Sequence, residues 1–208
     1  MNCISTEDVK EWNGRTIEID DSGTGDIVGD AFIGFHDVPT GEIIFRGISV
    51  GFYTEENRND DGPKKRILEA VKDGLKSLNY NKEHDRILLC RGSCFDLVRE
   101  WFEQEEFNYL PAIVEGKLQD AVEGRFISHL RSLGVKSKKL SKSAGKERFF
   151  ILFNWVCEDF PNREKFVKRG FPAWQKRWRG RAQNRYESKA QKRNFIKSRA
   201  KEILQKQI

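Results

Sequence analysis

The sequence has few of the features that mark membrane-spanning, secreted or zinc-binding proteins. No apolar run approaches the ~20 residues that a membrane helix needs, so we expect no membrane partner. Residues 1–8 are polar and acidic and lack the basic start and apolar centre of a secretory signal, which favours a cytoplasmic protein. The four cysteines contain no Cys-x-x-Cys pair, and with three histidines they offer no structural zinc spacing. We therefore expect reduced, buried thiols.

Charge is distributed unevenly along the 208 residues. Of 38 basic and 32 acidic residues, 16 basic and 3 acidic ones fall in residues 161–208, a net charge of +13. The preceding residues hold the other 22 basic and 29 acidic ones, a net charge of −7. A basic tail on an acidic body typically meets a polyanion, because each cation laid on a phosphate releases counterions. We expect nucleic acid (RNA, DNA or a hybrid) as the partner; a solvated tail without one is the alternative.

Aromatic residues interrupt this basic tail, whereas disordered solvating tails are poor in aromatics. Rings among cations suit stacking on bases or packing against the body. From residue 181 to 207 the chain has no Pro or Gly and carries apolar residues at loosely helical spacing, which predicts a long basic helix. The residues expected to contact nucleic acid are Lys168, Arg169, Trp174, Lys176, Arg177, Arg179 and Arg181.

The N-terminal part of the chain has the pattern of three consecutive strands. The first is short and apolar, ends in Asp20 and Asp21, and is followed by glycines at 23, 25 and 29. Residues 31–35 and 42–53 are further extended runs with a turn between them. Paired carboxylates at a strand end suit a hard divalent cation. A plain turn is the alternative, because Asp and Gly are common turn residues.

The middle of the chain alternates helix and strand. A helix begins at Asp61-Gly62-Pro63, residues 86–90 form a buried strand, and a second helix starts near Phe95. Residues 110–114 form a fifth strand, and a third helix follows it. The order is βββαβαβα, with the last two strands parallel and joined by a right-handed crossover. Residues 149–156 are apolar on every side, so periodicity cannot decide between helix and strand there.

These patterns predict an α/β protein in three parts. Residues 1–135 form the core, residues 136–160 a linker with a buried apolar segment, and residues 161–208 a basic, aromatic-rich helical extension. A chain of this length can bury a real core in one domain, and no repeat of solenoid period is present.

The element order and the opening motif resemble the ribonuclease H-like superfamily. Asp20-Asp21-Ser22-Gly23-Thr24-Gly25 is similar to the ribonuclease HII signature Asp-Glu-x-Gly-x-Gly, with Asp21 in place of the Glu and Thr24 in place of the usual Arg. Residues 160–161 and 168–172 are similar to that family's Tyr-Pro and Lys-Gly-Tyr-Pro segments. Residues 86–92 equally resemble the strand of a Piwi-type nuclease that ends in Arg-Asp-Gly. The resemblance implies a mixed five-stranded sheet with flanking helices.

The resemblance also implies a chemistry, in which two Mg²⁺ or Mn²⁺ ions between carboxylates hydrolyse a phosphodiester bond. It implies Asp20 as a metal ligand with Asp21 beside it, and Glu115, Asp120 and Glu123 are the acids of this sequence that could complete the set. We expect Asp20, Glu115 and Asp120 to be the catalytic residues, with Asp21 and Glu123 as additional metal ligands. Asp120 and Glu123 lie three residues apart, hence on one helical face able to share a cation. Acids that only complement the helix dipole are the alternative there.

One position departs from the family pattern. The fourth strand should end in an aspartate beside the first strand, but here it ends in Cys90-Arg91-Gly92, and a cationic Arg91 would repel a metal. Two functions therefore stay open: a metal-dependent nuclease, or a ribonuclease H-like module that binds nucleic acid or a partner without cleaving. Phosphate binding of the sugar-kinase and actin type, whose first loop reads Asp-x-Gly-Thr, needs two such domains, and the chain is too short for the pair.

Overall fold

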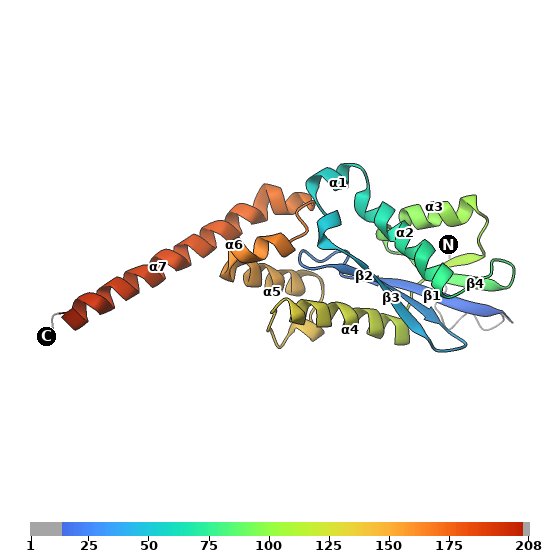
Figure 1. The fold of residues 1–208 in the computed structure, drawn as a ribbon, viewed down its shortest axis with the longest axis horizontal. Helices are drawn as coiled ribbons and strands as arrows, with labels where there is room; N and C mark the ends of the chain where they lie inside the picture. Colours follow the sequence, from blue (N-terminus) through green and yellow to red (C-terminus); the bar gives the residue numbers. More distant parts are fainter. Residues whose placement is uncertain (1–13, 206–208) are drawn as a thin grey trace.

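The computed structural model describes residues 14–205 and is built on one five-stranded sheet (Figure 1). The strands are β1 (Arg15–Ser22), β2 (Ala31–Asp37), β3 (Ile43–Ile48), β4 (Asp85–Cys90) and β5 (Tyr109–Ala112), in the spatial order β3-β2-β1-β4-β5. β1, β4 and β5 are parallel, and β2 is antiparallel to both of its neighbours. The predicted βββαβαβα order and the parallel last pair are confirmed. This mixed sheet is consistent with a ribonuclease H-like fold.

One face of the sheet is covered by α2 (Gly62–Ser77) and α3 (Asp96–Gln104). Alternate residues of β1, Ile17 and Ile19, point to this face and are fully buried with the apolar stripe of α2. The short elements η2 (Val50–Phe52), α1 (Glu55–Asn59) and η3 (Ser93–Phe95) complete this layer. The helix predicted from Asp61-Gly62-Pro63 is confirmed, since Pro63 stands in the first turn of α2.

The other face is covered by α4 (Lys117–Ser132), which packs on β1 and β2. Its close approach depends on Gly34, because a Cβ atom there would lie 2.9 Å from a methyl carbon of Leu118. Beyond α4, a second hydrophobic core includes α5 (Gly145–Glu158) and α6 (Phe160–Arg163). Residues 149–156, which the sequence left open between helix and strand, are therefore helical.

The C-terminal residues return to the loop that follows β1. η4 (Leu140–Lys142) lies in the predicted linker, and η5 (Glu164–Phe166) follows α6. The Gly29 amide donates to the carbonyl of Phe166, and the Lys168 amide donates to that of Ile27, both at 2.9 Å. Residues 166–168 therefore hold the β1–β2 loop from outside the sheet.

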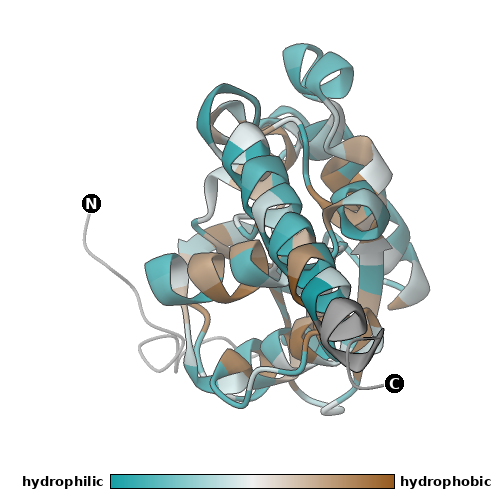
Figure 2. Cartoon of the chain, turned by 90° about the vertical axis from the view of Figure 1, so that its left-hand side faces the viewer, coloured by the Kyte–Doolittle hydropathy of each residue, from teal (hydrophilic) through white to brown (hydrophobic). Residues whose placement is uncertain are grey.

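The described part of the chain ends in a π-helical turn, η6 (Trp174–Trp178), and the long helix α7 (Arg179–Gln205), so the predicted long basic helix is confirmed. Ala182 is buried against the second core, and Arg185 donates a 2.6 Å hydrogen bond to Asn154 of α5. From Glu187 to Arg199 only Ala190 is not exposed. α7 accordingly projects away from the body, and its outer surface is mostly hydrophilic (Figures 1 and 2). Within residues 14–205, no helix is long and apolar enough to cross a membrane.

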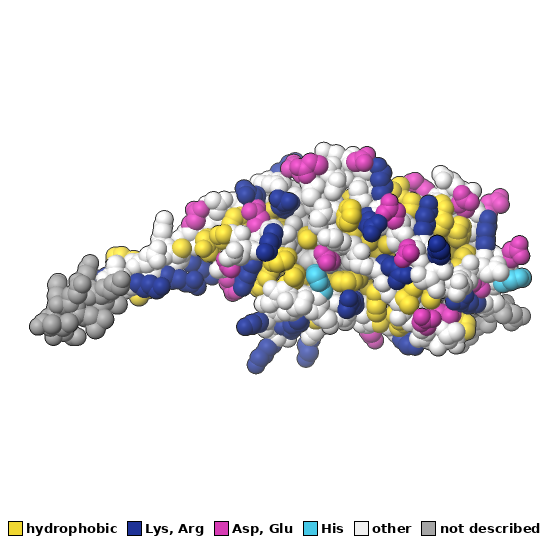
Figure 3. Space-filling view, in the orientation of Figure 1, with side chains coloured by type: hydrophobic (Ala, Val, Ile, Leu, Met, Phe, Trp, Pro, Cys, Tyr) yellow, Lys and Arg dark blue, Asp and Glu magenta, His cyan; other side chains and the backbone are white. Residues whose placement is uncertain are grey.

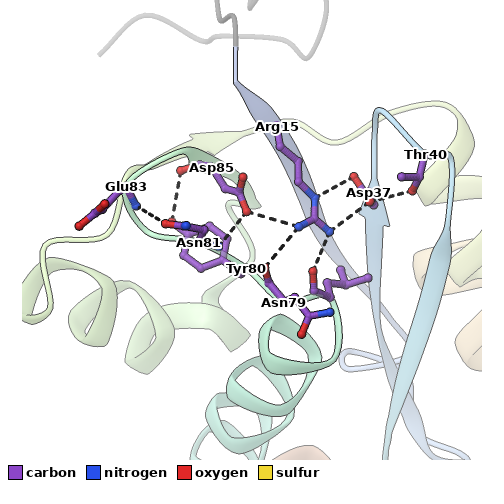
Figure 4. A network of polar contacts seen from close by, with 9 residues as sticks. Arg15, Asp37, Thr40, Asn79, Tyr80, Asn81, Glu83 and Asp85 are labelled. Atoms are coloured by element: carbon purple, nitrogen blue, oxygen red, sulfur yellow. Dashed lines mark hydrogen bonds and ion pairs between the residues drawn. The ribbon is translucent and has the colours of Figure 1, made fainter.

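An ionic cluster fixes the amino end of β1 (Figure 4). Arg15 donates two 3.1 Å hydrogen bonds to Asp37 of β2 and one of 3.4 Å to Asp85 of β4. It also donates to the carbonyl of Leu78 at the end of α2, at 2.7 Å. One guanidinium thus joins three strands and a helix at this end of the sheet.

Candidate functional site

Every second residue of β1 is polar and buried on the face that α4 covers. Each of these side chains has a partner on a neighbouring element: Thr16 with Arg86, Glu18 with His36, Asp20 with Cys90, and Ser22 with Glu123. Burying polar groups costs free energy unless they are hydrogen-bonded, so this row is placed by specific pairing rather than by apolar packing. The row runs along β1 to the edge of the sheet where the parallel strands β1 and β4 end.

Asp20, Asp21 and Cys90 meet at that end. β1 and β4 are parallel and pair Ile19 with Leu89, which puts Cys90 beside Asp20. One ligand atom from each of the three side chains lies within 4.8 Å of the other two. Burial raises the pKa of Asp20, which is 6% exposed, and burial with the nearby Asp20 carboxylate raises the pKa of Cys90 to about 12. Asp20 and Asp21 were predicted from the sequence to act together, and the structure brings them together.

Asp21 faces a cavity of about 670 Å³. Its carboxylate accepts a 2.5 Å hydrogen bond from Thr24 and lies 3.3 Å from the sulfur of Cys94 in η3. The cavity continues between the start of α2 and residues 170–171. Tyr53 forms part of its wall, and its buried hydroxyl has no hydrogen-bond partner in the described part of the chain.

Glu123 and Asp26 form a second pair of acidic side chains near the cluster, and both are paired with an arginine. Arg148 of α5, only 8% exposed, forms an ion pair with Glu123 and another of 3.2 Å with Asp26. Glu123 also accepts a 2.6 Å hydrogen bond from Ser22. Burial raises the pKa of Asp26, although the nearby Arg148 and Lys168 oppose that rise. A guanidinium therefore stands where these two acids could have held a metal ion.

The remaining predicted acids are outside the cluster. Glu115 follows β5 and Asp120 lies in the first turn of α4, and both are exposed. Neither contributes to a group of metal-ligating atoms among the described residues. The structure thus brings together Asp20 and Asp21 from the predicted set, but not Glu115, Asp120 or Glu123.

This donor set does not fit the two Mg²⁺ or Mn²⁺ ions that the resemblance implies. Those ions prefer several hard oxygen ligands, whereas the cluster offers two carboxylates and a thiol. A thiol is a soft ligand that such ions seldom use. With Glu123 held by Arg148, no further carboxylate completes a two-metal site in residues 14–199.

Sequence reasoning missed Cys94 and Arg148. Cys94 stands four residues after Cys90, so the 3₁₀ turn η3 brings it back toward Asp21, and that spacing is a usable signal. Arg148 directly precedes the apolar run at 149–156, and an arginine beside a segment predicted to be buried needs an acidic partner. The identity of that partner depends on tertiary structure alone.

Two of the residues expected to contact nucleic acid are instead structural. Lys168 is fully buried, donates to the carbonyl of Gly23 and lies 4.6 Å from the centre of the Tyr53 ring. Burial lowers its pKa to about 8. Trp174 is 1% exposed within the second core. These side chains hold the extension against the body and are not available to a phosphate or a base.

The other five predicted contact residues lie on the surface. Arg169, Lys176, Arg177, Arg179 and Arg181 are all exposed. Arg177 and Arg181 lie over the ring of Trp178, at 4.8 and 5.2 Å from its centroid, and Arg179 pairs with Glu164 at 2.5 Å. Lys and Arg side chains continue along the projecting part of α7 (Figure 3).

No protein-family model matches this chain, and no curated protein matches it in sequence.

Proposed function

We propose that this is a ribonuclease H-like protein that binds nucleic acid through α7 and does not hydrolyse it by a two-metal mechanism. The observation that carries the proposal is the unbalanced charge of the projecting helix. Between residues 187 and 199 the exposed charged side chains are one acid, Glu187, and five cations: Lys189, Lys192, Arg193, Lys197 and Arg199.

The helix has no need of these cations for its own packing. Only the first turns of α7 contact α5, and the exposed part is built from strong helix formers such as Lys, Arg, Ala and Gln. At 1.5 Å per residue, residues 187–199 extend for about 20 Å. Double-stranded DNA carries a negative charge about every 1.7 Å along its axis, so a helix of this length reaches several phosphates.

The acid cluster supports binding without hydrolysis. Two-metal hydrolysis needs ions that stabilise both the attacking and the leaving oxygen. Here Cys90 stands at the end of β4 where the resemblance implies an aspartate, and Arg148 occupies the position between Glu123 and Asp26. The protein therefore has the acidic pair Asp20 and Asp21, but in its described part it lacks the further carboxylates that would hold a second metal ion.

Binding is tested by its salt dependence. We expect the affinity for duplex DNA, RNA and a hybrid to fall steeply with salt, and Lys189→Ala, Lys192→Ala and Arg193→Ala together to lower the slope of log K against log[salt] by about 1 per cation removed. The matched control carries the same charge change on α2 and the following loop: Lys72→Ala, Lys76→Ala and Lys82→Ala, all exposed. A flat salt dependence, or an equal loss in the control, would refute the role of α7.

Hydrolysis is tested on the same substrates with Mn²⁺ and with EDTA. We expect no cleavage by the wild-type protein. Cleavage that disappears both with EDTA and in Asp20→Asn would show that the protein is instead a metal-dependent nuclease. Cleavage unchanged in Asp20→Asn would indicate a contaminating activity, because Asp20 is the most deeply buried acid of the cluster.

A further inference from the structure

We infer that Asp20, Asp21 and Cys90 form a site for one thiophilic divalent cation, of the Zn²⁺ or Co²⁺ type, rather than for Mg²⁺. The inference goes beyond the proposed function and is independent of nucleic acid. Its basis is the donor set, since thiolate sulfur combined with carboxylate oxygen is typical of zinc sites and foreign to magnesium sites.

The spacing of the donors suits a single ion. Ligands about 2.0–2.3 Å from a tetrahedral ion lie roughly 3.5 Å from one another. The three ligand atoms here are within 4.8 Å of one another, so small side-chain rotations close the site. The ends of two paired strands carry the ligands, which fixes their backbone positions.

The electrostatics of the cluster call for a cation. Asp20 is 6% exposed, and its hydrogen bonds come from the Cys90 thiol and the Asp21 backbone amide rather than from a cation. A buried carboxylate without a cationic partner is costly. Arg148 is paired with Glu123 and Asp26, Lys168 donates to the carbonyl of Gly23 while its charge acts on Asp26, Asp30 and Asp21, and the side chain of Arg91, which follows Cys90, is exposed. A divalent ion would remove that cost.

A second observation concerns the cavity beside the cluster, which Asp21 lines and which would give a ligand access to the site. The cavity beside Asp21 and Cys94 is walled in part by Tyr53, which is 5% exposed and has a buried hydroxyl without a partner. Buried polar groups are nearly always hydrogen-bonded, so an unpaired phenol points to a missing water or ligand. Three protein ligands would leave a fourth position for a water, and the sulfur of Cys94 lies 3.3 Å from the Asp21 carboxylate beside the site.

Cobalt is the probe that distinguishes this site. Cys90 must lose its proton to the buffer when it binds the ion, and Co²⁺ bonded to thiolate gives a charge-transfer band in the near ultraviolet. We expect the full-length apoprotein to show this band with one equivalent of Co²⁺. Zn²⁺ should remove it, and a thousandfold excess of Mg²⁺ should not.

Variants assign the ligands. Cys90→Ser should abolish the band, and Asp20→Asn should weaken Co²⁺ binding by about 100-fold or more, beyond the 10- to 100-fold typical of residues that only support a ligand. Cys157→Ala, which alters a buried thiol of α5 outside the cluster, is the control and should leave the band unchanged. Circular dichroism of each variant checks that it is folded. A folded wild-type protein without the band, or a band that survives Cys90→Ser, would overturn the inference, whether or not the protein binds nucleic acid.

Discussion

Buried carboxylates lie at both ends of β1, but among the described residues only those at the amino end have a cationic partner. At the amino end, Asp37 and Asp85 are 2% and 5% exposed, and both are paired with Arg15 (Figure 4). At the carboxyl end, Asp20 is 6% exposed, but its partner is the Cys90 thiol and no described cation neutralises it. The ion pairs at the amino end stabilise the fold, whereas the buried charge of Asp20 at the carboxyl end destabilises it.

The pKa values follow this division. Burial acts to raise the pKa of Asp37, but hydrogen bonds from Arg15 and Thr40 outweigh it and hold the pKa below its usual value. Burial also raises the pKa of Asp20, and there the hydrogen bonds from Cys90 and from the Asp21 amide do not offset it. Unfavourable ionisation of this kind is concentrated at functional sites, where stability is given up for activity or binding.

The largest effect is expected from breaking the amino end. Arg15→Met leaves Asp37 and Asp85 buried without their cation, and removing one partner of a buried pair costs about 3–5 kcal/mol. Because the Arg15 side chain is 27% exposed, we expect a loss near 3 kcal/mol in the free energy of unfolding, measured by urea denaturation. The control is Asp73→Asn, which removes an exposed partner of Arg46 and should cost less than 1 kcal/mol. Equal losses would show that the Arg15 cluster does not stabilise the fold.

Neutralising one acid at each end should change stability in opposite directions at pH 7. Asp37→Asn removes charged hydrogen bonds and should destabilise the protein by about 1.5–3 kcal/mol. Asp20→Asn removes an unfavourable buried charge and should stabilise it by about 0.5–2 kcal/mol. A loss of stability in Asp20→Asn, measured on metal-free protein, would show that its charge is compensated.

The pH dependence tests the same contrast. The stability due to ionised Asp37 is fully present above the unfolded-state pKa of 3.8 and is lost as the pH falls through its lower folded-state pKa. The penalty of ionised Asp20 is absent below 3.8, grows as the pH rises toward its higher folded-state pKa, and is constant above it. Urea denaturation between pH 3 and 7 should therefore show the two variants diverging from wild type in opposite directions as the pH rises.

The sheet could be predicted from the sequence because its signals are local. Alternating or continuous apolar runs marked all five strands, and Pro63 marked the start of α2. Residues 149–156 could not be assigned, since a segment buried on all sides has no periodic face, and only the second core shows it to be a helix.

The candidate site could be predicted only in part. Asp20 and Asp21 are neighbours in sequence at a strand end, so their meeting was foreseeable. The ion pair between Arg148 and Glu123 was not foreseeable, because it joins residues 25 apart in the sequence on two different helices. Lys168 was mistaken for a phosphate contact because burial of a lysine in a basic stretch leaves no mark in composition. Composition identified the charge of the extension, and packing decided which cations face the solvent.

The smallest effects concern two threonines that occupy equivalent positions at the two ends. Thr40 donates to Asp37 at 2.7 Å, and Thr24 donates to Asp21 at 2.5 Å, each from three residues later in the chain. Asp37 already receives two hydrogen bonds from Arg15, and the Glu42 amide that donates to Thr40 at 3.2 Å is exposed and can bind water instead, so Thr40→Val should cost only about 0.5 kcal/mol. Thr24→Val leaves Asp21 with the weak Cys94 thiol donor, so about 1 kcal/mol is expected. Urea denaturation of both variants measures the difference in the free energy of unfolding. A larger loss of stability for Thr40→Val would mean that Arg15 does not satisfy the hydrogen-bonding capacity of Asp37. Val matches the shape of Thr, so the ranking depends on these hydrogen bonds and on the exposure of the two side chains, since Thr24 is half-buried and Thr40 is exposed.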